Sequence, residues 1–205
     1  MSDRQLTDSI HSAVILWLDP VCPFSWKTAG WLIAAADKAG FDIDLRLMSL
    51  ATLNEGRVLP APQQARMHDS RKLGRLMVAL RSELGADAMA KAYFAFGHRH
   101  FDQSAALDDE LVEHVLAAVG ARHVTADALT DASLDAVVKE SHWASQEALG
   151  EAGGSPLITI EGHTMFGPVL TSVPAPDATL AVFDAVSTLL LTPEFSQLQR
   201  PRNHA

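Results

Sequence analysis

The sole cysteine of the 205-residue chain, Cys22, lies in the stretch DPVCPFSW, residues 19–26. An apolar run ends just before this stretch and a helical pattern begins within it, so we predict that Cys22 is a helix N-cap. Pro23 then takes the first helical position, where its missing N–H costs nothing. The free N–H groups of Phe24 and Ser25 point toward the sulfur, as does the positive end of the helix dipole. Such settings lower a cysteine pKa from about 8.5 to about 3.5–7.5, which predicts a reactive thiolate.

A serine, Ser25, stands where a dithiol motif carries its second sulfur. A dithiol pair closes into a disulfide by itself, whereas a single thiol forms a mixed disulfide that an external thiol must resolve. The sequence therefore predicts a low-molecular-weight thiol as partner, and catalytic roles for Cys22 and for Ser25, whose hydroxyl can hydrogen-bond to the sulfur. Two alternatives stay open: a non-redox role for the sulfur, or a small apolar side chain buried in the core.

The segments around Cys22 have the patterns of a strand, a helix and a second strand. Residues 13–18, AVILWL, form an apolar run typical of a strand buried on both faces. Apolar residues recur at helical spacing after Pro23, until Gly40 supplies a stop. In residues 41–48, FDIDLRLM, apolar and charged side chains alternate with the period of a strand. This order predicts a βαβ unit with a parallel strand pair.

The rest of the chain divides into a helical block and a second strand region. Residues 60–150 are dominated by alanine, leucine and charged residues, and predict about four helices, one of them over 108–120. In residues 153–167, LITI and TMF flank EGH, the expected connection of a hairpin. A final helix follows, for which Asp177 is the expected cap. Its predicted apolar stripe consists of Leu180, Phe183, Val186 and Leu190.

This order of elements is that of the thioredoxin fold with a large helical insertion, as in DsbA-like proteins. We therefore predict an α/β protein with a mixed central sheet, because a parallel pair is followed by an antiparallel hairpin. The thioredoxin-like domain is expected over residues 1–56 and 152–205, and the helical insertion domain over 57–151. In this fold the loop before the third strand carries a cis-proline that faces the redox cysteine. Pro156 has that position, and the backbone of Ser155 can pair with the peptide-like groups of a bound thiol.

Composition excludes several classes of function. The formal net charge is −9, from 16 Lys+Arg against 25 Asp+Glu, which argues against nucleic acid and anionic membranes as partners. One cysteine cannot build the disulfide framework of a small secreted protein. The N-terminal residues are polar, and we find no signal peptide or membrane span, so a cytoplasmic protein is expected. No glycine-rich phosphate loop is present, which predicts no flavin or nucleotide.

Other polar residues are weaker candidates for ligand binding. The cluster HRH, residues 98–100, lacks the spacing of a zinc site, so no metal is expected. His98 and His100 are either solvated or part of a cleft wall that contacts an anionic or sugar group of a thiol. Asn54 either contacts a ligand near the active-site edge or caps a loop. Trp26 is expected to pack in the core or between domains.

Five stretches of the sequence resemble the mycothiol-dependent nitroreductases, a cytoplasmic DsbA-like family of actinobacteria. They are DPVCPFSW, MSLATLNEGR, KESHWASQEALGE, GSPLITIEG and FGPVLTSVP, in order along the chain from about residue 13 to 175. The resemblance implies a homodimer and an active cysteine that reacts with mycothiol and reduces small electrophilic or nitro substrates, or disulfides. Cys22 matches the attacking cysteine of the family, and Pro23 and Pro156 match its two prolines.

The chain departs from this family at two positions of the motif. The family usually shows C-P-W-C, where this chain has Phe24 and Ser25. The expected chemistry is thus a single mixed disulfide at Cys22, with Pro23 and Phe24 beside the bound thiol. A second resemblance, to D-x-x-S-P-Y-S-W of kappa-class glutathione transferases and 2-hydroxychromene-2-carboxylate isomerases, implies that a bound thiol cofactor supplies the sulfur. A third possibility is a thiol-binding paralogue without turnover.

Overall fold

The computed structural model describes residues 14–201, and its centre is a mixed four-stranded sheet in the order β2-β1-β3-β4. β1 pairs in parallel with β2 and antiparallel with β3, and β3 and β4 form an antiparallel hairpin. The predicted mixed sheet is therefore confirmed. Ala13, the first residue of the predicted first strand, lies outside the described residues. The strands are β1 (Val14–Leu18), β2 (Ile43–Leu47), β3 (Leu157–Ile160) and β4 (His163–Phe166).

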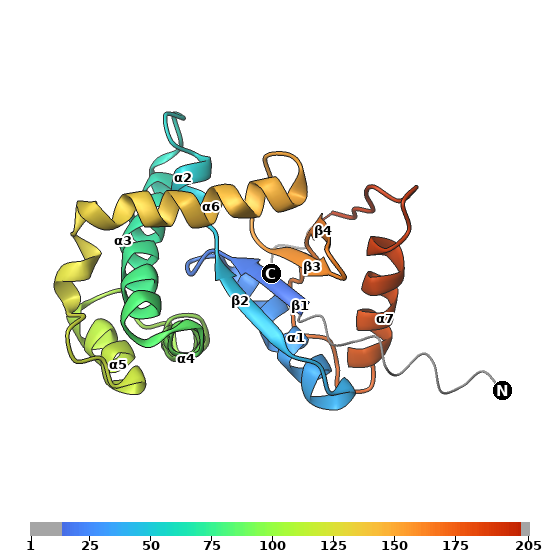
Figure 1. The fold of residues 1–205 in the computed structure, drawn as a ribbon, viewed down its shortest axis with the longest axis horizontal. Helices are drawn as coiled ribbons and strands as arrows, with labels where there is room; N and C mark the ends of the chain where they lie inside the picture. Colours follow the sequence, from blue (N-terminus) through green and yellow to red (C-terminus); the bar gives the residue numbers. More distant parts are fainter. Residues whose placement is uncertain (1–13, 202–205) are drawn as a thin grey trace.

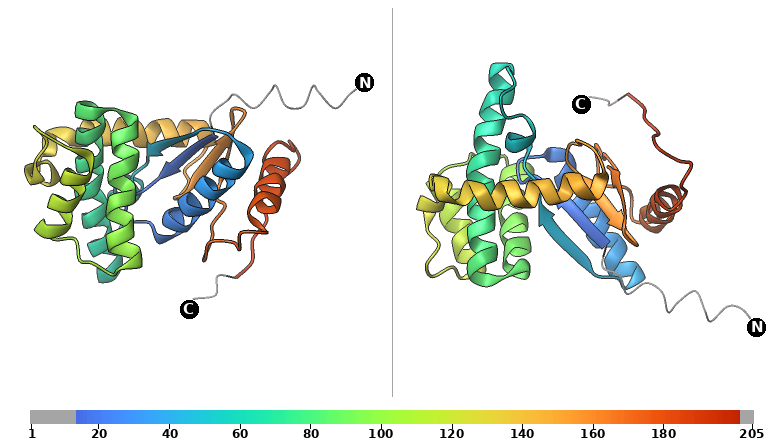
Figure 2. Two further views of the ribbon diagram at one scale, coloured as in Figure 1. Left: turned by 90° about the horizontal axis from the view of Figure 1, so that it is seen from below. Right: turned by 45° about the horizontal axis from the view of Figure 1, so that its top comes forward.

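Helices pack on both faces of this sheet and in a block beside it (Figure 1). α1 and α7 pack together, while α6 contacts β2, β3 and β4 from the opposite face, as the views in Figure 2 show. α3, α4 and α5 form the helical block beside the sheet, which confirms the prediction of about four helices there when α6 is included. The longer helices are α1 (Pro23–Ala39), α3 (Ala61–Leu84), α4 (Ala86–Gly97), α5 (Asp109–Val119), α6 (Asp135–Leu149) and α7 (Thr179–Leu190). Shorter elements are α2 (Leu50–Leu53), the π-helix η1 (His98–Asp102), and the 3₁₀ helices η2 (Ala126–Leu129) and η3 (Ala132–Leu134).

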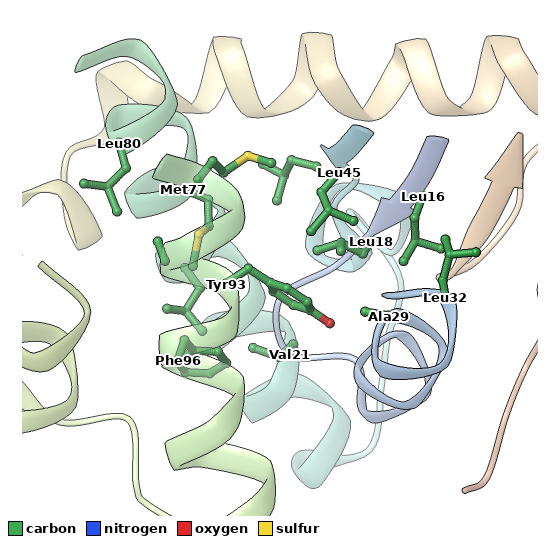
Figure 3. Packing of buried hydrophobic residues seen from close by; sticks show 14 of the residues in the cluster. Leu16, Leu18, Val21, Ala29, Leu32, Leu45, Met77, Leu80, Tyr93 and Phe96 are labelled. Atoms are coloured by element: carbon green, nitrogen blue, oxygen red, sulfur yellow. The ribbon is translucent and has the colours of Figure 1, made fainter. Parts of the chain in front are cut away.

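The core runs without a break from the sheet into the helical block (Figure 3). Leu16 of β1 and Leu32 of α1 belong to the same buried cluster as Met77 of α3 and Phe96 of α4. One continuous core fixes the helical block against the strand that carries the Cys22 loop. The division into a domain of residues 1–56 and 152–205 and a second of 57–151 stays a prediction, and its two ends lie outside the described residues.

Two details near the C-terminus differ from the sequence predictions. The hairpin turn contains two residues, not three: Glu161 and Gly162 have φ of 51° and 81°, and His163 belongs to β4. Positive φ at both turn residues gives a two-residue turn whose twist matches that of the flanking strands. A three-residue connection does not require positive φ at two positions. Asp177 does not cap α7, whose N-cap is Ala178 without a side-chain bond. Leu180 is 36% exposed, so the buried part of the stripe begins one turn later.

Trp26 joins α1 to the helical block, as expected for a packing tryptophan. Its ring stacks on Phe101 at a centroid distance of 5.8 Å, and its Nε1–H donates to Asp102 at 2.9 Å. A Cβ atom added at Gly97 would lie 2.3 Å from the Trp26 ring. The close approach of α1 and α4 therefore requires glycine at this point.

This close approach predicts opposite effects for two glycine-to-alanine substitutions in helices. Gly97→Ala should lower the free energy of unfolding by about 1–3 kcal/mol, because the added methyl group collides with Trp26. Gly30→Ala is the control, since its Cβ would meet Val173 at 3.6 Å, an ordinary contact. It should raise stability by about 0.5–1 kcal/mol through helix propensity. Chemical denaturation of both variants measures the difference, and equal stabilities would refute the packing role of Trp26.

Candidate active site

Cys22 is the N-cap residue of α1, as the sequence predicts. Its backbone is extended, with φ −83° and ψ 113°, and Pro23 is the first helical residue. The Cys22 N–H donates to the Asp19 carbonyl oxygen at 3.1 Å, which closes a turn between β1 and α1. The first turn of α1 thus holds the sulfur at the helix N-terminus.

The loop before β3 faces this helix end. The Ser155–Pro156 peptide bond is cis. The Cys22 thiol donates to the Ser155 carbonyl oxygen at 3.4 Å, and the hydroxyl oxygens of Ser25 and Ser155 are 2.6 Å apart. The structure therefore brings together Cys22, Ser25, Ser155 and Pro156, although more than a hundred residues separate the two pairs along the chain.

Asp19 is the residue of this site that the sequence analysis missed. Its side chain is fully buried, and one carboxylate oxygen accepts from the N–H of Val21 at 2.9 Å. The other accepts from the N–H of Leu50 at 2.6 Å and from the hydroxyl of Ser70 at 2.5 Å. The N–H of Asp19 itself donates to the Ser155 hydroxyl at 2.8 Å. An acidic residue directly after a buried strand, in the D-x-x-C-P pattern, was the signal that could have identified it.

Burial corrects the prediction of a low Cys22 pKa. The residue is 4% exposed, and loss of solvent raises the pKa of its thiol above the ordinary value, with a further rise from the charge of Asp19. Hydrogen bonds from the Ser25 side chain and from the N–H groups of Ser25 and Phe24 lower this pKa, but by less. The helix-end effects expected from the sequence are present. They are outweighed by desolvation, which favours the neutral thiol.

A crevice of about 200 Å³ opens beside the Cys22 loop. Arg66 and Asp69 of α3 line it, together with His100 of η1, and Val21 forms its wall next to Cys22. The sequence analysis identified His100 but missed Arg66 and Asp69, because which face of α3 meets the loop depends on tertiary packing. The other lining residues are Pro62, Ala65, Phe96 and Leu107.

Two further residues predicted to bind a ligand, His98 and Asn54, do not line this crevice. His98 is exposed, and its ring nitrogens contact Asp102 at 3.4 Å and Gln103 at 3.2 Å, outside the crevice lining. The Asn54 amide donates to the Leu50 carbonyl oxygen at 2.9 Å, at the C-cap of α2. This contact agrees with the second of the two roles expected for Asn54, that of capping a loop. Contact of either side chain with a ligand stays a prediction.

Another hollow, of about 270 Å³, lies between α2, α3 and α6 and is not lined by the residues around Cys22. Four of its charged groups form two pairs: Lys139 contacts Glu55 at 2.8 Å and Arg75 contacts Asp135 at 2.7 Å. Within residues 14–201, no three histidine, cysteine or acidic side chains gather as metal ligands. The same part of the chain contains no helix with the length and hydropathy of a membrane span.

Comparison with known proteins assigns the chain to a family. The model of the Rv2466c-like family, described as mycothiol-dependent nitroreductase Rv2466c, matches residues 21–200. The chain belongs to this family. Among curated proteins, it is similar to the uncharacterized protein Rv2286c of Mycobacterium tuberculosis, with 28% identity over 190 residues, 91% of this chain and 81% of that protein. This member of the Rv2466c-like family thus has a relative whose name states no activity.

Solved structures show that this Rv2466c-like protein has the thioredoxin fold with a helical insertion of DsbA-like proteins. A 2-hydroxychromene-2-carboxylate isomerase superposes with a TM-score of 0.58 at 19% identity, covering 86% of this chain and 95% of the isomerase. The cytosolic disulfide reductase DsbM from Pseudomonas aeruginosa, solved with GSH, gives 0.53 at 19% identity, with 86% and 100% covered. The fold predicted from the sequence is confirmed.

Removal of the Ser25 hydroxyl tests how this group affects the pKa of Cys22. Because its hydrogen bond lowers the pKa of Cys22, Ser25→Ala should raise that pKa further. Alkylation by iodoacetamide at pH 7 should slow severalfold, because a smaller fraction of the Cys22 sulfur is then thiolate. Ser145→Ala is the matched control, a fully buried serine of α6 that donates to the His142 carbonyl oxygen. Equal alkylation rates in wild type and Ser25→Ala would show that the hydroxyl does not act on the sulfur.

Proposed function

We propose that this protein is a thiol-disulfide oxidoreductase that acts through one mixed disulfide between Cys22 and mycothiol. Membership of the mycothiol-dependent nitroreductase family supports thiol chemistry in general. The observation that carries the proposal is the placement of the only thiol, at a helix N-terminus and 3.4 Å from the Ser155 carbonyl oxygen at the cis-proline loop. A cysteine that served only as a core side chain would not need this arrangement.

The proposed reaction begins with loss of the Cys22 thiol proton. The thiolate attacks the mycothiol sulfur of a disulfide between mycothiol and a substrate thiol, forms a new S–S bond with it, and releases the substrate sulfur as a thiolate that takes up a proton. The N–H groups at the start of α1 and the Ser25 hydroxyl stabilise negative charge on Cys22 before the attack. Since Cys22 is 4% exposed, a disulfide gains access only when the contacts over the sulfur open.

Completion of the cycle requires a second external thiol, because residue 25 is serine. The thiolate of that second molecule attacks the mycothiol sulfur of the mixed disulfide, and Cys22 leaves as the thiolate. The substrate has then been released as a reduced thiol, and the mycothiol that it carried has joined the second mycothiol molecule in mycothiol disulfide. The protein itself ends in its starting redox state.

The residues around Cys22 suit a thiol that carries a hydroxyl-rich group such as the sugar of mycothiol. Asp69 and Arg66 supply an acceptor and a donor in the crevice lining, to which His100 also belongs. Pro23, Phe24 and the Ser155 backbone would contact the cysteine-like portion nearest the sulfur. Burial raises the pKa of Asp19, while its hydrogen-bond donors and, to a smaller extent, the charge of Arg66 lower it, so Arg66 couples the crevice to the buried carboxylate.

A second candidate is a transferase or isomerase in which a bound thiol supplies the reacting sulfur. The fold shared with the 2-hydroxychromene-2-carboxylate isomerase and the hydroxyl pair of Ser25 and Ser155 favour this candidate. In that case activity survives Cys22→Ser, whereas the disulfide mechanism predicts complete loss. A thiol-binding protein without turnover predicts a mycothiol complex but no catalysis.

We also propose a cytoplasmic location and a homodimer, as the family resemblance implies. A free thiol and its low-molecular-weight partner stay reduced in that compartment. Light scattering after size exclusion tests the dimer.

The mixed disulfide can be measured directly by intact mass. Incubation with mycothiol disulfide should add one mycothiol, less one hydrogen, to the wild-type chain, and excess mycothiol should remove it. Cys22→Ser should gain no mass, and Ser145→Ala should behave as wild type. Absence of any adduct on the wild-type protein at pH 8–9, where more of the thiol is ionised, would refute the proposal.

A further inference from the structure

Tyr93 is the only tyrosine of the chain, and its hydroxyl is an unsatisfied polar group in the core. The residue lies on α4 and is 1% exposed, and its hydroxyl has no hydrogen-bond partner among the described residues. A buried hydroxyl without a partner destabilises the folded protein, whereas phenylalanine would fill the same space without that cost. We therefore expect the Tyr93 hydroxyl to gain a hydrogen-bond partner in another state of the site.

The ring of Tyr93 is held in one orientation by aromatic neighbours. Its centroid lies 5.8 Å from the Trp26 ring in an edge-on contact, and 5.3 Å from the Phe94 ring. Figure 3 shows the ring extending from α4 toward α1, with its hydroxyl oxygen between Val21 and Ala29. Cys22 follows Val21 directly, so the hydroxyl is aimed at the turn that carries the sulfur.

Burial and nearby charge decide the protonation state of the Tyr93 hydroxyl. Burial raises the pKa of Tyr93 well above its ordinary value, and charges on Cys22 and on Asp19 raise it further. The phenol therefore stays protonated and can only act as a hydrogen-bond donor to a nearby anion. Of the two anions, Asp19 already accepts from three donors, whereas the Cys22 sulfur in its thiol form donates its proton to Ser155.

We propose that Tyr93 is a further catalytic residue, whose hydroxyl donates a hydrogen bond to the Cys22 sulfur when that sulfur carries negative charge. In the thiol state this bond is absent and the hydroxyl is unpaired. In the thiolate state, both before attack and when Cys22 leaves the mixed disulfide, the hydroxyl joins the N–H groups of α1 and the Ser25 hydroxyl around the sulfur. This role rests on the proposed function, and it offsets part of the desolvation that opposes ionisation of Cys22.

Tyr93→Phe separates this role from simple packing, because it keeps the ring and removes only the oxygen. Below the ionisation midpoint, alkylation of Cys22 by iodoacetamide should slow about tenfold or more, with the pH profile displaced to higher pH and the same plateau rate. At pH 7, where the resting sulfur is a thiol, the melting temperature should stay equal or rise, because an unpaired hydroxyl has been removed. An unchanged pH profile would overturn the proposal.

A second measurement uses the wild-type protein and needs no variant to fold. With tyrosine labelled with ¹³C at Cζ alone, the chain gives a single tyrosine resonance, whose shift should titrate with the same midpoint as Cys22 alkylation. Cys22→Ser should abolish that titration, and a midpoint in the acid range in its place would assign the hydroxyl to Asp19 and refute the proposal. Neither measurement uses mycothiol, so failure of the mycothiol adduct and failure of the Tyr93 role give different results.

Discussion

The buried carboxylate of Asp19 is the interaction on which the rest of the site depends. Its two oxygens accept from Val21, Leu50 and Ser70, and so join the end of β1, the start of α2 and the middle of α3. The N–H of the same residue donates to the Ser155 hydroxyl. A buried charge is tolerated only with such a set of donors, and each donor fixes one segment around the cysteine turn.

Burial sets the chemical character of the Cys22 sulfur, and the Asp19 carboxylate adds to its effect. Desolvation and the neighbouring negative charge favour the thiol at Cys22, against the donors of the helix N-terminus. The protein thus holds its cysteine protonated and covered at rest, and the sulfur becomes nucleophilic only when a base or higher pH removes the proton. A hydrogen-bond donor that binds the sulfur only when the sulfur is a thiolate, as proposed for Tyr93, is consistent with this arrangement. Such a donor stabilises the thiolate and leaves the stability of the resting thiol state unchanged.

Much of the fold could be predicted because it follows from local patterns. The apolar run of β1, the proline after Cys22 and the glycine at residue 40 fix the βαβ unit and the N-cap with few long-range contacts. The loop of Ser155 could be placed because the order of elements specifies which strand it precedes.

The remaining features depend on contacts between distant segments. Asp19 binds Ser70, 51 residues away, and the orientation of α3 decides that Arg66 and Asp69 face the crevice. Periodicity alone does not reveal how deeply a helix end is buried, so the pKa of Cys22 was predicted in the wrong direction. The unpaired hydroxyl of Tyr93 is likewise visible only when the packing around it is known.

The most direct test of the central claim is a crystal structure of the protein after reaction with mycothiol disulfide. The account predicts an S–S bond from mycothiol to the Cys22 sulfur, with the cysteine-like portion beside the Ser155 backbone and the sugar in the crevice of Arg66, Asp69 and His100. An unmodified Cys22 with mycothiol bound noncovalently, or with none bound, would contradict it.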